Sequence, residues 1–196
     1  MRGVWAGALV GLTLLGGACL RAAPPVFHGL PVGEPLPTAI TLLDHRHRPF
    51  PLDTLKGTVT FLTFGYTLCP DVCPTTLVTL RQARALLGAE AANVRALFVT
   101  TDPDRDTPER LQWYVSLFHP EFIGLTGASP SLARLYRAFN VYPAPYVAAG
   151  SGQGVRIGHG TAIYLLDRRA TVRFSYPWGV LAADLAADAR ALLAER

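Results

Sequence analysis

The first clear pattern along the chain is a pair of apolar runs separated by an amphipathic segment. Residues 59–66 and 94–101 are rich in β-branched and aromatic residues, which is typical of buried strands. Between them, leucines recur at helical spacing over residues 74–87 and Gly88 follows, which predicts an amphipathic helix that ends at a glycine. Strand, helix and strand in this order predict a βαβ unit with parallel strands.

The rest of the body continues this alternation. Thr107 and Pro108 predict the N-cap and first residue of a helix, and Ser129, with Pro130 behind it, predicts the cap of a helix that runs to Phe139. Further elements are predicted as strands over 38–44, 122–125, 161–167 and 171–176, and as a closing helix over 179–195. A βαβ unit followed by a ββα unit predicts an α/β fold: a thioredoxin-like mixed sheet flanked by helices, with an N-terminal hairpin extension.

The N-terminal part differs in composition from this body. Arg2 is followed by an apolar stretch that ends in small residues before Cys19, so residues 1–21 predict a signal or lipoprotein leader, or a membrane anchor if left uncleaved. Residues 22–37 are rich in proline and predict a tether without regular structure. The domain over 38–196 is therefore expected to be anchored to the cell membrane and to face the periplasm or extracytoplasmic space, with a secreted product as the alternative.

Composition and charge narrow the range of functions. With 196 residues, half of them hydrophobic, the chain predicts one domain of ordinary size. The net charge of +4 comes from arginines spread along the sequence and from Lys56, without a basic run, which does not favour nucleic-acid binding. The single methionine is Met1, so a Met-ligated blue-copper site is excluded. A Gly-rich stretch over residues 148–154 predicts a mobile loop.

The candidate chemistry lies in two of the three cysteines, Cys69 and Cys73, where a predicted strand gives way to a predicted helix. Positions four apart in a helical turn face one side, and a helix N-terminus favours the thiolate, so both sulfurs are expected to engage one ion or one disulfide. A structural disulfide is the alternative, but a bond closing so short a loop constrains little of the unfolded chain. Two thiolates form a soft site that suits Cu(I) or zinc, and a structural zinc site would need more ligands than these cysteines supply.

A histidine is the expected third ligand for Cu(I), and of the five histidines His159 is the best candidate. It follows the Gly-rich stretch and immediately precedes the strand predicted over 161–167, so it is placed to swing onto a preformed thiolate pair. His45 and His47 alternate in a polar hairpin and are expected to be solvated. His28 lies in the predicted tether.

Three motifs together resemble those of the Sco/SenC family. They are Gly65-Tyr66-Thr67-Leu68-Cys69-Pro70-Asp71-Val72-Cys73-Pro74, Asp102-Pro103-Asp104-Arg105-Asp106-Thr107-Pro108, and Gly158-His159-Gly160-Thr161-Ala162-Ile163-Tyr164-Leu165-Leu166-Asp167. The resemblance extends from about Ile40 to the final helix, and its most specific part is the block over residues 69–74. Gly160 stands where a serine is expected after the histidine, which affects only local hydrogen bonding.

The resemblance implies a membrane-tethered thioredoxin-like domain that binds copper through Cys69, Cys73 and His159. It implies a metallochaperone that carries a copper ion, Cu(I) or alternatively Cu(II), to the binuclear copper site of cytochrome c oxidase, or that maintains the thiols of that site. The implied partners are the copper-accepting oxidase subunit and other periplasmic copper carriers or thiol reductases. Asp71 and Asp102 match acidic positions of the motifs and are candidates for supporting the ligands, with capping or turn roles as alternatives.

Two enzymatic functions are the alternatives. Cys69 and Cys73 also form a candidate redox-active pair, so a thiol-disulfide oxidoreductase without metal delivery stays open, although such enzymes favour two residues between the cysteines and this chain has three. A metallochaperone with thiol-disulfide reductase activity would combine both roles. A peroxidase of the peroxiredoxin type would need proline at 62 and threonine at 66, where the chain has Leu62 and Tyr66.

Overall fold

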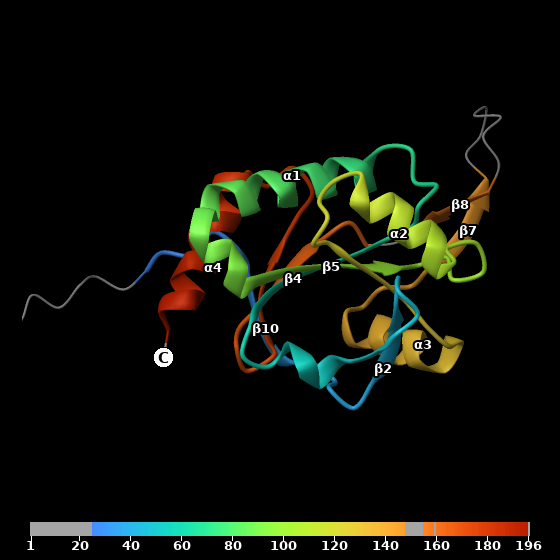
Figure 1. The fold of residues 1–196 in the computed structure, drawn as a ribbon, viewed down its shortest axis with the longest axis horizontal. Helices are drawn as coiled ribbons and strands as arrows, with labels where there is room; N and C mark the ends of the chain where they lie inside the picture. The colour runs from blue at the N-terminus through green and yellow to red at the C-terminus, as the bar shows by residue number, and fades with distance from the viewer. Residues whose placement is uncertain (1–24, 148–154, 159, 196) are drawn as a thin grey trace, which may run out of the picture.

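The structure is a computed structural model that describes residues 25–147, 155–158 and 160–195 (Figure 1). The strands are β1 (Leu30–Pro35), β2 (Thr41–Asp44), β3 (Pro49–Pro51), β4 (Val59–Gly65), β5 (Val94–Thr100), β6 (Ile123–Thr126), β7 (Ala144–Val147), β8 (Val155–Gly158), β9 (Ile163–Leu166) and β10 (Thr171–Tyr176). The helices are α1 (Val72–Leu87), α2 (Pro108–Ser116), α3 (Ser129–Ala138) and α4 (Ala182–Ala194), with short 3-10 helices η1 (Leu52–Leu55) and η2 (Gly88–Asn93).

One mixed sheet organises the domain. Its strand order is β1-β10-β9-β4-β5-β6-β2-β3, and β7 pairs with β8 in a separate ribbon. Neighbouring strands β4, β5 and β6 run parallel, whereas β9 is antiparallel to both β4 and β10. Strands β2 and β3 form the predicted hairpin extension. The prediction of a thioredoxin-like mixed sheet flanked by helices is therefore confirmed.

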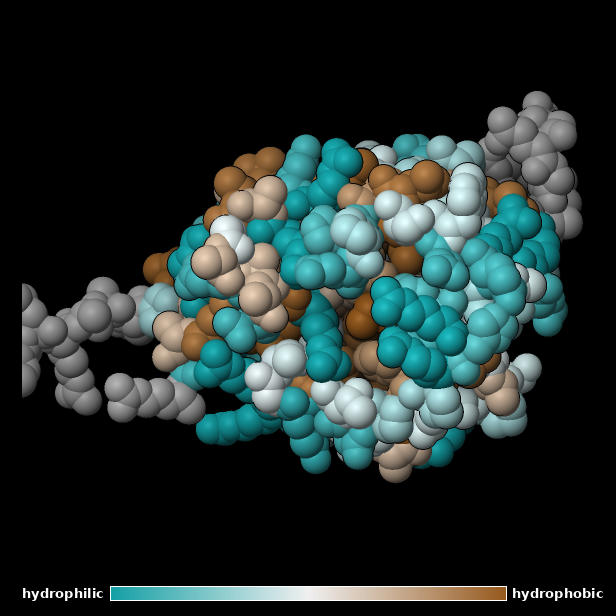
Figure 2. All heavy atoms as spheres, viewed as in Figure 1, coloured by the Kyte–Doolittle hydropathy of each residue, from teal (hydrophilic) through white to brown (hydrophobic). Residues whose placement is uncertain are grey.

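Helices cover both faces of this sheet. Side chains of α1, α2 and α4 join an apolar cluster on one face, and those of α3 and η1 join a second cluster on the other. Strand β4 serves both clusters, because Phe61 belongs to the first and Leu62 and Phe64 to the second. Outside these clusters, hydrophilic residues cover much of the face shown in Figure 2. The buried strand β4 thus fixes the start of the loop that leads to α1.

The proline-rich segment differs from its prediction. A tether without regular structure over 22–37 is wrong for Leu30–Pro35, because β1 pairs antiparallel with β10 at the edge of the sheet. Proline is tolerated there because one side of an edge strand has no ladder partner. The pairing shifts register between Pro31 and Glu34, and Gly33 between them adopts a φ of 81°, which suits glycine.

The residues just before β1 are also held by the domain. The ring of Phe27 stacks on Phe174 with 4.4 Å between centroids. The backbone N–H groups of His28 and Gly29 donate to the buried carboxylate of Asp188 in α4, and Nδ1 of His28 lies 2.8 Å from the same carboxylate. His28 is therefore part of the folded domain and not of a tether.

Two local predictions have mixed outcomes. Thr107 does cap α2, since its side chain accepts from the Arg110 N–H. Ser129 is not a cap, because α3 begins at Ser129 itself and Ala128 is the N-cap, without a side-chain hydrogen bond. Pro130 consequently occupies the second helical position, where a missing N–H costs no intrahelical bond.

Two predicted segments lie outside the described residues. One is the mobile loop over 148–154, whose flanking strands β7 and β8 pair antiparallel and were not predicted. The other is the leader over 1–21. Within the described part of the chain, no helix combines the length and the apolar composition needed to cross a bilayer. The character of the leader therefore stays a prediction.

Candidate metal centre

Cys69 and Cys73 lie where β4 leads into α1. Cys69 is partly exposed in the turn before the helix, and its N–H donates to the Tyr66 carbonyl at 3.1 Å. Cys73 is the second residue of α1 and is only 3% exposed. The expectation that one helical turn carries both cysteines is wrong, because Asp71 is the N-cap and Cys69 precedes it. The loop, and not helical periodicity, brings the two side chains together.

The two cysteines are thiols in contact with one another. They are not joined in a disulfide, and a hydrogen bond to Cys69, burial and the charge of Cys69 together raise the pKa of Cys73 well above its usual range. A backbone hydrogen bond from Tyr66 opposes this shift without reversing it. Burial and contact with Cys69 therefore oppose the preference for the thiolate that was expected from the helix N-terminus. Two adjacent thiolates need a positive charge beside them, which a bound cation would supply.

Gly65, the last residue of β4, leaves room for the buried sulfur. A Cβ placed there would lie 2.7 Å from Sγ of Cys73 and 2.6 Å from Cε2 of Phe98. Such distances are too short for any side chain, so Cys73 can occupy its position only beside a glycine. The Gly65 carbonyl also accepts from the Thr101 N–H at 2.7 Å and from the Thr101 hydroxyl at 3.1 Å. The end of β4 is thus fixed next to the cysteine.

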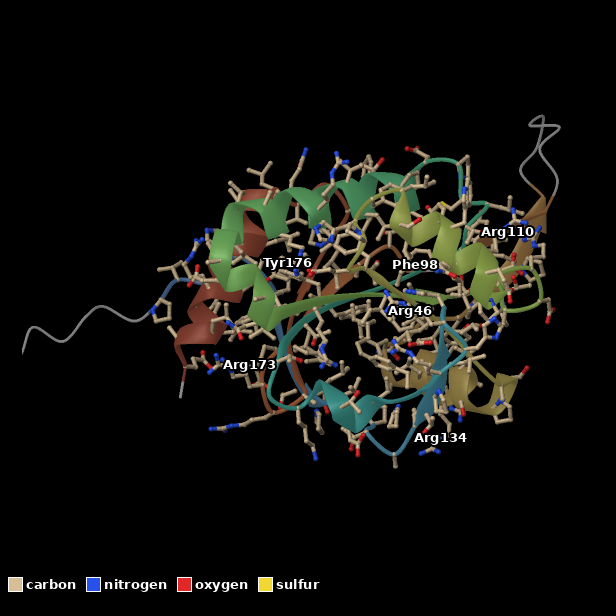
Figure 3. All side chains as sticks on the ribbon, viewed as in Figure 1. Arg46, Phe98, Arg110, Arg134, Arg173 and Tyr176 are labelled. Atoms are coloured by element: carbon tan, nitrogen blue, oxygen red, sulfur yellow. The ribbon has the colours of Figure 1, made fainter. Side chains whose placement is uncertain are left out.

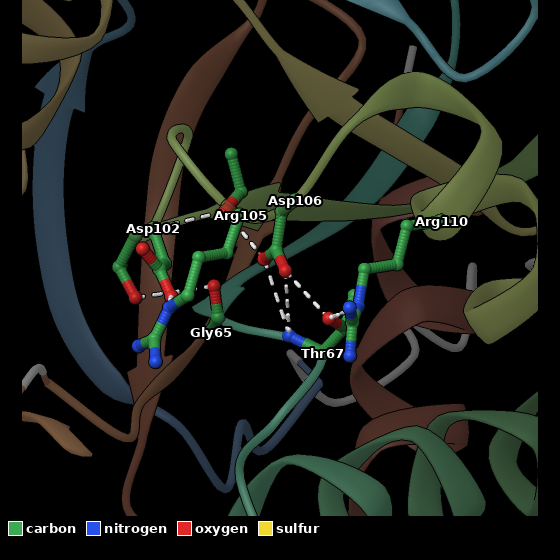
Figure 4. A network of polar contacts seen from close by, with 8 residues as sticks. Gly65, Thr67, Asp102, Arg105, Asp106 and Arg110 are labelled. Atoms are coloured by element: carbon green, nitrogen blue, oxygen red, sulfur yellow. Dashed lines mark hydrogen bonds and ion pairs between the residues drawn. The ribbon is translucent and has the colours of Figure 1, made fainter. Parts of the chain in front are cut away.

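A fully buried carboxylate, Asp106, fastens the loop that carries Cys69 (Figure 4). It accepts from the Thr67 N–H at 3.1 Å, from the Thr67 hydroxyl at 2.5 Å and from the Thr100 hydroxyl at 2.6 Å. Nε of Arg110 in α2 donates to the same Thr67 hydroxyl at 2.8 Å. Burial raises the pKa of Asp106, and the hydrogen bonds from Thr100 and Thr67 oppose that shift. Thr67 is thereby tied to both β5 and α2.

Asp71 and Asp102, the two acidic residues named from the motifs, make only local contacts. Asp102 accepts at its carbonyl from the N–H groups of Arg105 and Asp106, and its carboxylate pairs with Arg105. It therefore has the turn role that was one of its alternatives. Asp71 is exposed at the N-cap position of α1, but its side chain makes no capping hydrogen bond. Whether either residue supports a metal ligand stays a prediction.

His159, the predicted third ligand, lies outside the described residues. Within the described residues, no three His, Cys, Asp or Glu side chains gather to hold a metal ion. The chain next to His159 nevertheless reaches the same end of the sheet, since Ile163 pairs with Thr63 two residues before Gly65. Thr161 and Ile163 also line a cavity of about 60 Å³ together with Thr76 of α1.

The other histidines are engaged elsewhere. The prediction that His45 is solvated is wrong: it is 6% exposed, and its Nδ1 accepts from the Gly124 N–H at 2.9 Å. Burial, then the charge of Arg46, lowers the pKa of His45, which favours the neutral ring that can accept this bond. His47 is exposed as predicted and contacts Glu109.

Sequence reasoning missed the residues that position the cysteines. A glycine that closes a run of buried strand residues signals a close approach, and Gly65 fits that description. No local pattern distinguishes Asp106 from its neighbours Asp102 and Asp104, because its role depends on contacts with Thr67 and Thr100. Tertiary structure is needed to find such a residue.

The fold and the paired thiols define a thioredoxin-like domain with one cysteine just before its first long helix and one in the first turn of that helix. The SCO1/SenC family model matches residues 33–194, and the chain belongs to this family. It is 35% identical over 127 residues to a SCO2-like protein of Rickettsia prowazekii, covering 65% of this chain and 62% of that protein. It is 40% identical over 132 residues to the mitochondrial SCO2 homolog of Bos taurus, covering 65% and 48%. The chain thus spans less than two thirds of these relatives.

Solved structures share the fold. ScoI of Bradyrhizobium japonicum with copper bound is 31% identical, with a TM-score of 0.70, over 81% of this chain and 98% of that one. BsSco, a member of the Sco family of cytochrome c oxidase assembly proteins in which a disulfide switch was identified, matches with a TM-score of 0.66 over 85% and 97%. At 21% identity, BsSco supports the fold alone.

Proposed function

We propose that this protein is an extracytoplasmic metallochaperone that binds copper as cargo through Cys69, Cys73 and His159. The observation that carries the proposal is the contact between two thiols that are not oxidised, one partly exposed and one buried. Thiolates are soft ligands that suit Cu(I), and a partly exposed sulfur leaves the ion accessible to an acceptor protein. Copper bound to the similar ScoI of Bradyrhizobium japonicum supports this choice of cargo.

His159 completes the proposed site from the segment that enters β9. The pairing of Ile163 with Thr63 supports this, since it brings that segment to the end of β4. An imidazole and two thiolates can satisfy Cu(I), which accepts two or three ligands, whereas Cu(II) would favour further nitrogen or oxygen donors. Cu(I) is therefore the proposed cargo and Cu(II) the alternative.

Membership of the SCO1/SenC family supports cytochrome c oxidase assembly as the task. The proposed acceptor is the oxidase subunit that holds the binuclear copper site, and periplasmic copper carriers or thiol reductases are further partners. Residues 1–21 would attach the domain to the membrane as a lipidated or uncleaved segment, which places it on the extracytoplasmic side.

The test is a Cu(I) titration of the reduced protein against a strong Cu(I) chelator. We expect one ion per chain, and Cys69→Ser, Cys73→Ser and His159→Ala should each weaken binding by more than about 100-fold, because losing a ligand costs more than losing a group that supports one. His47→Ala is the matched control, since this exposed histidine contacts Glu109 elsewhere and should bind as wild type. Unchanged affinity in His159→Ala would remove that residue from the site.

A thiol-disulfide oxidoreductase is the second candidate, favoured by the unequal exposure of the two sulfurs. Cys69, the more exposed, would attack a partner disulfide and form a mixed disulfide with it. Buried Cys73 would then attack the sulfur of Cys69 and release the partner. The partner leaves as a dithiol and this protein becomes the disulfide. Insulin reduction driven by dithiothreitol, measured beside the chelator titration, separates the functions: fast turnover with Cu(I) binding too weak to resist the chelator favours the enzyme.

A further inference from the structure

The hydroxyl of Tyr114 is an anomaly in the core. Tyr114 lies in α2 and is 6% exposed, and its Oη has no hydrogen-bond partner among the described residues. A buried hydroxyl without a partner destabilises the folded state, while a phenylalanine would fill the same space without that cost. An orphaned buried polar group calls for an explanation, and a redox or catalytic role is one of the recognised ones.

The surroundings of this hydroxyl point to the cysteine pair. The Tyr114 ring packs against Phe98 and Phe118, with 5.4 and 5.3 Å between centroids. Phe98 and Cys73 are themselves the two side chains that crowd Gly65, and all three large side chains share one apolar cluster with Cys73. Burial, then electrostatic interaction with Cys73, Cys69 and Asp106, raises the pKa of Tyr114, so the phenol keeps its proton.

We propose that Tyr114 is a positioning residue whose O–H donates to the sulfur of Cys73 when copper is bound. This inference rests on the proposed function. No acceptor lies within hydrogen-bond distance of this hydroxyl in the described structure, so the bond requires the buried sulfur to shift when the cysteine pair binds a cation. The bound thiolate is then a stronger acceptor than the thiol. The hydrogen bond holds the buried sulfur in place and stabilises its negative charge.

A positioning role for Tyr114 predicts that removing its hydroxyl weakens Cu(I) binding without lowering thermal stability. Tyr114→Phe removes only the hydroxyl, so the variant should bind Cu(I) roughly tenfold more weakly, as for other groups that support a metal ligand. Its thermal stability without copper should be equal to or higher than that of wild type, because no hydrogen bond is lost and an unsatisfied hydroxyl is removed. A packing role would instead leave affinity unchanged or lower both quantities together.

Tyr176→Phe is the matched control. Tyr176, labelled with Phe98 in Figure 3, is a buried tyrosine of the same cluster, but its hydroxyl already donates to Asp188 at 2.7 Å. Its loss should lower thermal stability and leave Cu(I) affinity unchanged. The two variants therefore separate a hydroxyl that serves the fold from one that serves the site.

The experiment combines chelator competition, thermal unfolding without copper and near-ultraviolet absorption. On Cu(I) loading, wild type should show a red-shifted tyrosine difference band, because the phenol becomes a donor to an anion, and Tyr114→Phe should lack it. Equal affinity and an unchanged band in Tyr114→Phe would overturn the inference while leaving the proposed function standing. A fall in affinity matched by a fall in stability would also overturn it. If wild type binds no Cu(I), the proposed function fails and the inference with it.

Discussion

Asp106 and Asp188 are two fully buried carboxylates, and each holds an irregular segment in place at a different end of the domain. Asp106 holds the loop before α1, which carries Cys69, and Asp188 holds His28 and Gly29, which lead into β1. In Figure 1 that loop lies to the right and the N-terminal segment to the left. In each case one acidic side chain fastens an irregular segment by accepting hydrogen bonds from it.

The difference lies in the partners. Asp106 accepts from backbone and hydroxyl donors of Thr67 and Thr100, which are neutral. Asp188 accepts from two backbone N–H groups and the Tyr176 hydroxyl and also contacts the ring of His28, which can become a cation. A buried carboxylate beside a cation is stabilised as an anion, whereas one among neutral donors carries more of its desolvation cost. Asp106 and Asp188 should therefore respond differently to substitution by asparagine.

Asp188→Asn should have the larger effect on stability. The amide replaces one acceptor oxygen with a donor that faces existing donors, so at least one of His28, Gly29 and Tyr176 loses its partner. We expect a loss of about 2–4 kcal/mol in the free energy of unfolding, since bonds to a charged group are lost and a buried donor is left unsatisfied. Urea unfolding measures the loss. Cu(I) affinity should stay at the wild-type value, and a parallel fall would show that the two ends are coupled.

Asp106→Asn should have the smaller effect on stability and the larger effect on Cu(I) binding. Its cost in stability should be smaller, about 1–2 kcal/mol, because the substitution also removes the desolvation that raises the pKa of this carboxyl, and the Thr100 hydroxyl can turn to accept. The effect on the site should be larger, since Thr67 loses part of its attachment two residues before Cys69. We expect roughly tenfold weaker Cu(I) binding in the chelator competition. Wild-type affinity in this variant would mean that the loop is held well enough by Arg110 alone.

The main elements of the fold could be predicted because hydrophobic periodicity determines them. Strand β4 and helix α1 follow their predicted ranges closely, and the cysteine motif between them was found from its spacing. Strand β1 could not be predicted, since its prolines are tolerated only at a sheet edge and that edge is defined by β10, far away in the sequence. Local composition carries no information about such a partner.

The site was predictable in its ligating cysteines and less so in their environment. His45 was placed in solvent because its neighbours are polar, yet pairing of β2 with β6 brings the Gly124 N–H to its ring. The surroundings of Cys73 were missed for a related reason: a helix N-terminus is visible in sequence, whereas burial beside Gly65 and contact with Cys69 are not. Asp106 and Tyr114 likewise acquire their roles only from residues distant in the chain.

The smallest expected effect is a pH dependence at the Asp188 end. Hydrogen bonding to Asp188, then the charges of Asp188 and Asp184, raises the pKa of His28 above its usual 6.5, and burial opposes this. A histidine pKa that is higher in the folded state stabilises the protein fully below 6.5, and this contribution is lost as the pH rises through the folded value. The urea midpoint should therefore fall as the pH rises above 6.5, and His28→Asn should flatten that slope. If His28→Asn shows the same pH dependence of the urea midpoint as wild type, the dependence belongs to another group. The other titratable side chains that face this contact are Asp184, Asp188 and Tyr176.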